Sequence, residues 1–137
     1  MTSPTLKFIG HLKTPYKTPA DCPGQARPEN GVTQIVVDEA YADGLTGLKE
    51  GGHIQVMYWF DRADRTSIKR VPKWSRNGEE RGVFSIRSPH RPNPIALSTV
   101  EIHKIERNML TVTAMDAVDG TALLDIKPYL NQLAPKS

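Results

Sequence analysis

The stretch IALSTVEIHKIERNMLTVTAMDAVDGTALLDI, residues 95–126, decides the fold class of this chain. Its apolar and β-branched residues fall in three runs that short polar turns separate, which is typical of successive strands. Glu106-Arg107-Asn108 has the length and polarity of a hairpin loop, and Asp119-Gly120 is a strong hairpin signal. The stretch therefore predicts three strands joined by hairpins. They cover residues 95–105, 109–115 and 121–126.

Further strands are expected upstream of this stretch. His53–Phe60 is the most apolar run and predicts a strand buried on both faces. Eleven prolines and ten glycines cluster between the apolar runs, as turns of a β-rich chain do. Residues 43–52 permit only one amphipathic turn. The sequence thus predicts an all-β fold, a small closed antiparallel β-barrel with long loops and at most short helices. The upstream strands are expected at residues 6–12, 32–37, 53–60 and 82–86.

Size and composition limit the class of protein. The chain has 137 residues and a mass of 15.2 kDa, so we expect a single domain spanning 1–137. No apolar run has the length of a membrane helix, and residues 1–7 lack the apolar core of a signal peptide. Cys22 is the single cysteine, and the four histidines are scattered, so we expect no metal site. These features predict a cytoplasmic protein without a membrane segment.

Basic side chains are concentrated in residues 61–91. This segment carries nine basic residues against four acidic ones, a net charge of +5 in a chain whose total is +3. It also carries Trp74, an aromatic ring that can stack on an unpaired base beside cations that bind phosphate. The two interpretations are a nucleic-acid interface and a solvated surface loop. The basic residues are Arg62, Arg65, Lys69, Arg70, Lys73, Arg76, Arg81, Arg87 and Arg91.

The segment ends in a first dense motif, Arg87-Ser88-Pro89-His90-Arg91-Pro92-Asn93-Pro94-Ile95. Its three prolines fix φ and hold the preceding residues extended, which leaves little conformational freedom for a ligand to remove. A purely structural turn seldom needs two arginines, a histidine and an asparagine between its prolines. The motif therefore predicts a preorganised polar loop with a binding role.

A second dense motif runs from Asp116 to Tyr129. Asp125 lies there among leucine and isoleucine residues, and a buried carboxylate needs a partner or a ligand. A salt bridge to Arg87 or Arg91 would satisfy it structurally, and a cation or hydroxyl of a ligand would satisfy it functionally.

The two motifs resemble the signatures of a known family. Gly82–Ser98 and Asp119–Tyr129 are similar to those of the TsaA-like proteins, of the YaeB/TrmO type. These S-adenosylmethionine-dependent methyltransferases methylate N6 of threonylcarbamoyladenosine beside the tRNA anticodon. The resemblance extends over nearly the whole chain and includes residues 6–16, 45–48 and 53–60.

The resemblance implies an antiparallel barrel methyltransferase that uses S-adenosyl-L-methionine, acts on tRNA, and forms a homodimer with the cofactor near the subunit interface. It implies cofactor contacts at Pro23, Gly24, Gln25, Asp61, Arg62, Arg87, Leu97, Thr113, Ala114, Met115 and Asp116. The substrate-binding candidates are Arg91, Asn93, Lys127, Tyr129, Lys73 and Arg76. The candidates for the group that accepts the N6 proton are Asp125, Asp116 and His90.

Two positions depart from the family pattern. Gly24 stands where arginine is common, and Ala96 stands where glycine is usual. Two alternatives are therefore considered beside the tRNA methyltransferase: a methyltransferase of the same fold acting on a small molecule, and a non-catalytic RNA-binding barrel.

Overall fold

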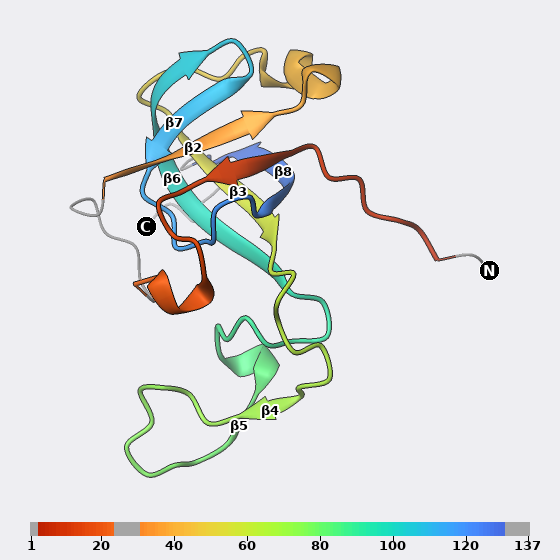
Figure 1. Ribbon diagram of the computed structural model, residues 1–137, viewed down its shortest axis with the longest axis vertical. Helices are drawn as coiled ribbons and strands as arrows, with labels where there is room; N and C mark the ends of the chain where they lie inside the picture. Colours follow the sequence, from red (N-terminus) through yellow and green to blue (C-terminus); the bar gives the residue numbers. More distant parts are fainter. Residues whose placement is uncertain (1–2, 24–30, 131–137) are drawn as a thin grey trace.

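A closed antiparallel barrel of six strands forms the body of the protein, which confirms the predicted fold class. The computed structural model describes residues 3–23 and 31–130 (Figure 1). Around the barrel the strand order is β1-β2-β7-β6-β3-β8, and β8 pairs with β1 to close it. The barrel strands are β1 (Gly10–Lys13), β2 (Val32–Val37), β3 (His53–Trp59), β6 (Ile95–Glu106), β7 (Met109–Thr113) and β8 (Ala122–Pro128).

Alternation of side chains along the strands builds the core. In β3, Ile54, Val56 and Tyr58 are buried inside the barrel, whereas Gln55 and Met57 on the outer face are half-buried. The prediction of a strand buried on both faces is therefore wrong, because a barrel wall has one face toward the core and one toward solvent. Six large side chains of the barrel interior are almost completely buried: Leu12, Ile35, Ile54, Ile102, Leu110 and Leu123.

The connection from β7 to β8 differs from the predicted hairpin. β7 pairs with β2 and β6, whereas β8 pairs with β3 and β1. The Asp119-Gly120 turn instead packs against the first loop, where Asp119 N donates to Tyr16 O (2.7 Å) and Gly120 N donates to Leu12 O (2.8 Å). The turn has this position because the chain must cross the end of the barrel for β8 to meet β1. By contrast, the predicted hairpin at Glu106-Arg107-Asn108 is confirmed between β6 and β7.

Local structure departs from the sequence prediction in three further places. Residues 6–8 precede β1, and the first strand begins at Gly10. Residues 82–86 do not form one strand: β5 (Arg81–Gly82) pairs with β4 (Lys69–Arg70), and η4 (Val83–Ser85) follows. The short helical segment expected within 43–52 occurs earlier, as the 3-10 helix η3 (Glu39–Leu45), and η1 (Pro19–Asp21) is a single turn in the first loop.

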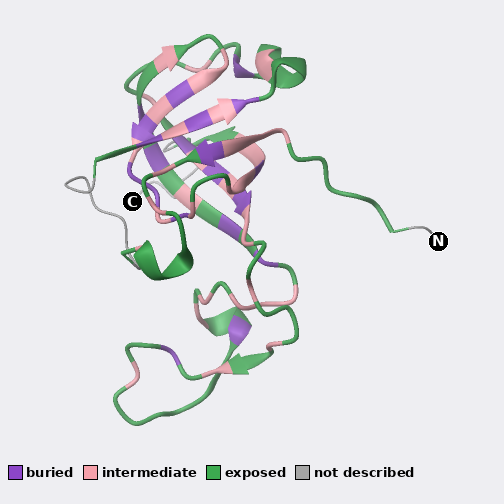
Figure 2. Ribbon diagram, in the orientation of Figure 1, coloured by how far each residue is buried: buried purple, intermediate pink, exposed green. Residues whose placement is uncertain are grey.

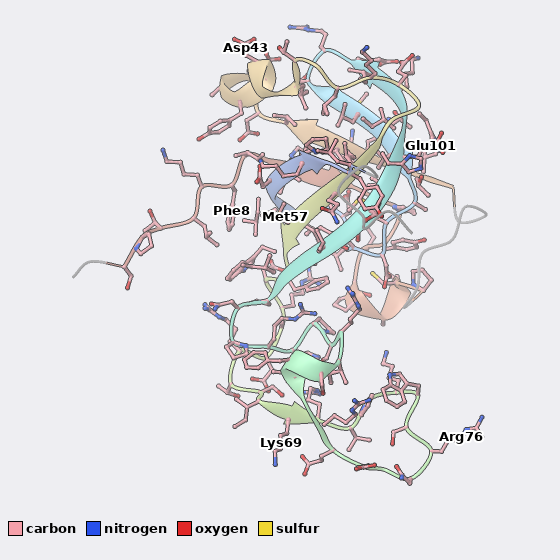
Figure 3. The ribbon with its side chains drawn as sticks, turned by 180° about the vertical axis from the view of Figure 1, so that it is seen from behind. Phe8, Asp43, Met57, Lys69, Arg76 and Glu101 are labelled. Atoms are coloured by element: carbon pink, nitrogen blue, oxygen red, sulfur yellow. The ribbon has the colours of Figure 1, made fainter. Side chains whose placement is uncertain are left out.

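Residues 61–94, which we call the arm, leave the barrel between β3 and β6 and project away from it (Figure 1). All nine basic residues of the charged segment belong to the arm. Most of the arm is exposed, in contrast to the barrel strands (Figure 2). Lys69 and Arg76 lie on the arm, and Asp43 lies at the opposite end of the molecule (Figure 3). The arm is therefore a basic extension beside the barrel.

The strand directions place three loops at one end of the barrel, which we call the loop end. There β1, β3 and β7 finish and β2, β6 and β8 begin. The loops that leave this end are residues 14–31, 60–94 and 114–121. The opposite end carries η3 and the β6–β7 turn. The helices within residues 3–23 and 31–130 are too short to cross a membrane.

Candidate functional site

The structure brings most of the predicted site residues to the loop end of the barrel. The proline-rich motif rejoins the barrel there, and the segment after β7 crosses it. Gly24 and Gln25 lie outside the described residues. The predicted residues on the three loops of this end, or on the last residue of β7, are Pro23, Asp61, Arg62, Lys73, Arg76, Arg87, His90, Arg91, Asn93, Thr113, Ala114, Met115 and Asp116.

The segment after β7 brings a carboxylate into the barrel end. Ala114, Met115 and Ala117 are buried, and Met115 N donates to the buried Thr33 Oγ1 (2.8 Å). Asp116 lies between them, and its Oδ1 is buried without a hydrogen-bond donor in the part of the chain that the structure describes. A buried acceptor without a donor costs free energy, so this oxygen is prepared for a donor from a ligand.

Tyr58 and Ser98 form a pair of hydroxyl groups inside the barrel. Tyr58 is 3% exposed, and its hydroxyl is 2.7 Å from Ser98 Oγ. The pKa of Tyr58 lies above its ordinary value, chiefly because the side chain is buried. The negative charge of Asp116 also raises this pKa, whereas the hydrogen bond with Ser98 and the positive charge of Arg91 lower it. The Tyr58 hydroxyl therefore lies within the electrostatic range of both a carboxylate and a guanidinium group.

The proline-rich motif is held in place by its own side chains. Arg91 donates from Nε to Ser88 O (2.7 Å) and from Nη1 to Ile95 O (3.0 Å). Burial, and then the positive charge of Arg87, lowers the pKa of Arg91. Since two arginines lie close together here, the loop favours an anionic group of a ligand between them.

Contacts within the arm position two other candidates. His90 accepts a hydrogen bond at Nδ1 from Asp64 N (2.9 Å), so in the neutral ring Nε2 carries the hydrogen and is the donor. Asn93 Oδ1 accepts from Arg65 Nη2 (3.4 Å). Arg65 also donates from Nε to Pro92 O (2.8 Å) and lies over the ring of Trp59 (5.2 Å). Arg65 thus fixes the arm to the barrel wall.

Four predicted site residues lie on the barrel strands or directly after β8, and not on the three loops. Leu97 is on the outer face of β6, where it is 49% exposed and opposite Met57. Asp125 Oδ1 and Oδ2 accept hydrogen bonds from Lys127 Nζ (2.9 and 2.8 Å), and Oδ1 also accepts from Ile126 N (2.9 Å). The partner of Asp125 is therefore Lys127, neither Arg87 nor Arg91. These four residues are Leu97 in β6, Asp125 and Lys127 in β8, and Tyr129 just after β8.

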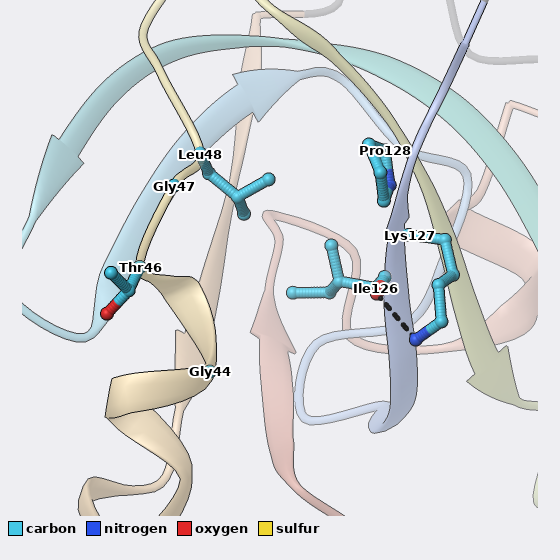
Figure 4. Close-up of a pocket in the computed structure, with 7 residues that line it drawn as sticks. All are labelled: Gly44, Thr46, Gly47, Leu48, Ile126, Lys127 and Pro128. Carbon is cyan, nitrogen blue, oxygen red and sulfur yellow. Dashed lines mark hydrogen bonds between the residues drawn. The ribbon is translucent and has the colours of Figure 1, made fainter.

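Two shallow cavities lie beside Asp125 and Lys127. One, of about 370 Å³, is between the segment after η3 and the last residues of β8, with Leu48, Ile126 and Pro128 in its wall (Figure 4). The other, of about 450 Å³, includes Tyr41 and Asp125. Both are apart from Asp116, so the predicted residues form two groups within one protomer.

Three residues of the loop end are not identified as site residues by the sequence pattern. Tyr58 lies in the most apolar run and was taken as core, although a buried tyrosine hydroxyl needs a partner. Ser98 has the same parity in β6 as Val100 and Ile102, which is the only signal that it faces inward. Cys22 is the single cysteine, and the sequence does not indicate its partner; in the structure it is close to Asp116.

We expect the thiol of Cys22 to be alkylated slowly at neutral pH. Burial first, and then the negative charge of Asp116, raises the pKa of Cys22, so at neutral pH the reactive thiolate is scarcer than in an ordinary cysteine. Rates of iodoacetamide labelling from pH 7 to 10 measure this, with N-acetylcysteine as reference. Asp116→Asn should increase the rate at pH 8 several-fold. Equal pH profiles for Cys22 and the reference would contradict the placement of Asp116.

The exposed part of the arm carries an aromatic surface among its cations. Trp74 is 65% exposed, and the guanidinium group of Arg81 lies 5.4 Å from its ring centroid. The predicted substrate residues Lys73 and Arg76 flank Trp74 in the chain and are exposed. Cations around an exposed ring suit phosphates and an unstacked base.

The fold and the site define the class of this protein as a six-stranded barrel whose polar site is built from loops at one end. Comparison with known proteins then identifies the family. The family model described as the tRNA-methyltransferase O N-terminal domain matches residues 11–134, and the chain belongs to this family.

Relatives with known names agree with this assignment. An S-adenosyl-L-methionine-binding protein of Archaeoglobus fulgidus is 48% identical over 124 residues, which is 90% of this chain and 88% of the relative. A relative in Methanothermobacter thermautotrophicus, named "Probable S-adenosyl-L-methionine-binding protein", is 38% identical, with 93% of this chain and 91% of the relative covered.

The fold matches solved structures. A crystal structure of TrmO from Pseudomonas aeruginosa has a TM-score of 0.70 and 23% identity, and the match covers 99% of this chain. The chain spans only 60% of the length of that protein. The names of these relatives include S-adenosyl-L-methionine, which is the cofactor that the family resemblance implies.

Proposed function

We propose that this protein is an S-adenosyl-L-methionine-dependent methyltransferase that methylates N6 of threonylcarbamoyladenosine in tRNA. The observation that carries the proposal is the loop end, where Asp116 Oδ1 is buried and receives no hydrogen bond from the described residues, and where Arg87 and Arg91 lie close together at the end of the basic arm. The family supports methyl transfer to tRNA, and the names of the relatives support the cofactor.

The residues of the loop end fit this cofactor. S-adenosyl-L-methionine carries hydrogen-bond donors on its ammonium group, ribose and adenine. Asp116 Oδ1 is a buried acceptor that receives no hydrogen bond from the described residues. When bound, the cofactor supplies an activated methyl group on its sulfonium. Asp116 and Arg87 bind it with Pro23, Asp61 and the neighbouring loop residues, and the buried 114–117 segment excludes water from one side.

The remaining chemical task is removal of the N6 proton. The ureido substituent makes this proton more acidic than that of plain adenine, so a weak base suffices. Asp125, Asp116 and His90 are the proposed acceptors, and His90 would accept at Nδ1 in place of its hydrogen bond from Asp64 N. Alignment of the acceptor nitrogen with the methyl group then supplies much of the rate, because an in-line displacement depends on orientation.

The arm is the proposed contact with tRNA. Lys73, Arg76 and Arg81 bind phosphates, and Trp74 stacks on an unpaired base of the anticodon loop. Substrate specificity beyond the adenosine then depends on Arg91 and Asn93 of the proline-rich motif and on Lys127 and Tyr129 at the end of β8.

We expect the affinity for tRNA to fall steeply with salt while the affinity for the cofactor does not. Phosphate contacts release counterions, and a few such contacts weaken binding about tenfold or more between roughly 50 and 200 mM salt. The cofactor carries no phosphate. Filter binding of tRNA and calorimetry of S-adenosyl-L-methionine over this range measure the difference, and salt-insensitive tRNA binding would contradict the role of the arm.

A homodimer is the proposed assembly, and the proposed location is the cytoplasm. Ile95 and Leu97 are 39% and 49% exposed on the outer face of β6, opposite Trp59 and Met57 of β3. An exposed apolar strand face supports contact with a second copy. Such contact would place Leu97 at a subunit interface and allow the Asp125 group of one protomer to approach the loop end of the other.

The direct test uses tRNA with and without the threonylcarbamoyl group. Radiolabelled methyl from S-adenosyl-L-methionine should enter only the modified tRNA, at N6 of the modified adenosine. Equal labelling of both tRNAs would overturn the substrate. Labelling of a metabolite pool instead of tRNA would favour the small-molecule alternative, and absence of cofactor binding would favour the RNA-binding barrel.

A further inference from the structure

Every side-chain acceptor of the proline-rich motif, residues 87–95, already receives a hydrogen bond from the arm. His90 Nδ1 accepts from Asp64 N (2.9 Å). Asn93 Oδ1 accepts from Arg65 Nη2 (3.4 Å). The hydroxyl oxygen of Ser88 accepts from His90 N (3.2 Å). Since arginine and proline side chains have no acceptor, the side chains of this motif offer few acceptors to a ligand.

Most main-chain carbonyl groups of the motif are occupied as well. Arg91 and Arg65 donate to three of them from their guanidinium groups, and main-chain N–H groups donate to two more. The five carbonyl oxygens that accept in this way are those of Ser88, Pro92, Asn93, Pro94 and Ile95. These oxygens are satisfied within the molecule, so they do not need donors from a ligand.

The donors of the motif, by contrast, remain available. The Asn93 amide has a fixed direction, because a guanidinium group has no acceptor: Oδ1 faces Arg65, and Nδ2 lies on the other side. Asn93 Nδ2, His90 Nε2 and Arg91 Nη2 donate to no acceptor of residues 3–23 or 31–130. In the same ranges neither Arg87 nor Arg91 forms an ion pair with a carboxylate. The motif therefore presents N–H donors and positive charge.

A surface of this kind selects an anionic oxygen group. Phosphate and carboxylate oxygens accept several hydrogen bonds and donate none, whereas an amine or an ammonium group needs acceptors that the motif does not offer. A tRNA with threonylcarbamoyladenosine has two groups of the required chemistry. They are the phosphates of its backbone and the carboxylate of the threonyl substituent.

We propose that the proline-rich motif binds an anionic oxygen group of the tRNA through Asn93 Nδ2, His90 Nε2 and Arg91 Nη2. Arg65 is then a positioning residue, because it holds the Asn93 oxygen and leaves the donor side of the amide for the substrate. The inference rests on the proposed function for the identity of the substrate. It gives His90 a role as a donor in binding, and it distinguishes Arg65 from the other cations of the charged segment.

Asn93→Asp tests the polarity of the amide. A carboxylate at this position still accepts from Arg65, but it meets the anionic group with an oxygen in place of the N–H. Asn93→Asp should weaken tRNA binding about tenfold or more, and Asn93→Ala only about threefold, because like charges repel. If Asn93 only fixed the arm to Arg65, the order would be reversed, since a carboxylate binds a guanidinium group more strongly than an amide does.

Asn77→Asp is the matched control for the added negative charge. Asn77 is also exposed on the arm, and its Oδ1 accepts from Glu79 N (3.2 Å). This variant should weaken tRNA binding less than about threefold, because a solvated charge acts only through the screened field of the arm. Filter binding is measured for each variant with tRNA that carries the threonylcarbamoyl group and with tRNA that lacks it.

A double-mutant cycle tests the positioning role of Arg65. If Arg65 acts through the Asn93 amide, the loss of tRNA affinity in the double variant Arg65→Ala, Asn93→Ala should be smaller than the product of the two separate losses. Residues that act independently give the product. A loss equal to the product would therefore overturn the positioning role.

The outcomes separate this inference from the proposed function. Equal weakening of both tRNAs by Asn93→Asp supports a backbone phosphate as the ligand, and weakening of the modified tRNA alone supports the threonyl carboxylate. If Asn93→Asp binds both tRNAs as well as Asn93→Ala does, or loses no more than Asn77→Asp, the inference is overturned while the proposed function stands. If the wild-type protein binds neither tRNA, both are overturned. Thermal melting shows that each variant measured is folded.

Discussion

Gly10→Ala should unfold the protein or lower its free energy of unfolding by about 3 kcal/mol or more. A Cβ atom at Gly10 would press on Val36 O and lie 2.9 Å from Val37 Cα, and both are backbone atoms of β2. Gly10 also pairs with Leu123 of β8, so the strand that would have to move is the one that closes the barrel. Urea unfolding followed by tryptophan fluorescence measures the loss.

Gly44→Ala is the matched control for this substitution. Nothing lies within 4 Å of the position where its Cβ atom would be built, and its φ is not in the left-handed region. We expect a change of less than about 1 kcal/mol, in either direction. If the two variants lost equal stability, the close approach of β1 to β2 at Gly10 would be disproved.

Asp125→Asn should reduce turnover about a hundredfold or more, the effect of losing a positioned base, and leave stability nearly unchanged. The partner of Asp125 is Lys127, and their side chains are 44% and 60% exposed. An exposed ion pair contributes about 1 kcal/mol or less, so removing one charge does not strand a buried ion. Single-turnover methyl transfer to modified tRNA and thermal melting, on the same preparation, measure both effects.

Glu106→Gln provides the comparison for Asp125→Asn. Glu106 pairs with Lys104 two residues away on an exposed strand, as Asp125 pairs with Lys127. This variant should lose neither stability nor turnover. A folded Asp125→Asn protein with normal turnover would remove Asp125 from the catalytic group and leave Asp116 and His90 as candidates.

The strands were predictable because their signal is local. Val32–Val37 matches its predicted bounds, and the predicted 53–60 and 95–105 strands differ from β3 and β6 by one residue each. The prediction of a hairpin between β7 and β8 was wrong because Asp119-Gly120 gives the same local turn signal whether or not the flanking strands pair. Pairing partners depend on closure of the whole barrel, which no short segment encodes.

The site was predictable in part for a related reason. Dense polar motifs identified Arg87, His90, Arg91 and Asp116, which the fold brings to one end. The hydrogen bond between Tyr58 and Ser98 was not visible, because an aromatic residue in an apolar run has the same pattern whether its hydroxyl has a partner or not. For Asp125 the sequence predicts either an arginine or a ligand as partner, but Lys127, two residues along the same strand, supplies the charge.

The hydrogen bond from Phe60 N to Pro94 O (2.9 Å) closes the base of the arm, and β3 and β6 pair directly below it. The 61–94 segment is therefore an insertion into an ordinary β-hairpin, whose two ends are already at turn distance. Lengthening such an insertion adds little loop-closure entropy, since that cost grows only with the logarithm of length. The proposed RNA contacts and the stability of the barrel can consequently change independently, because a substitution or an insertion in the arm alters its charge and length without altering the pairing of the strands.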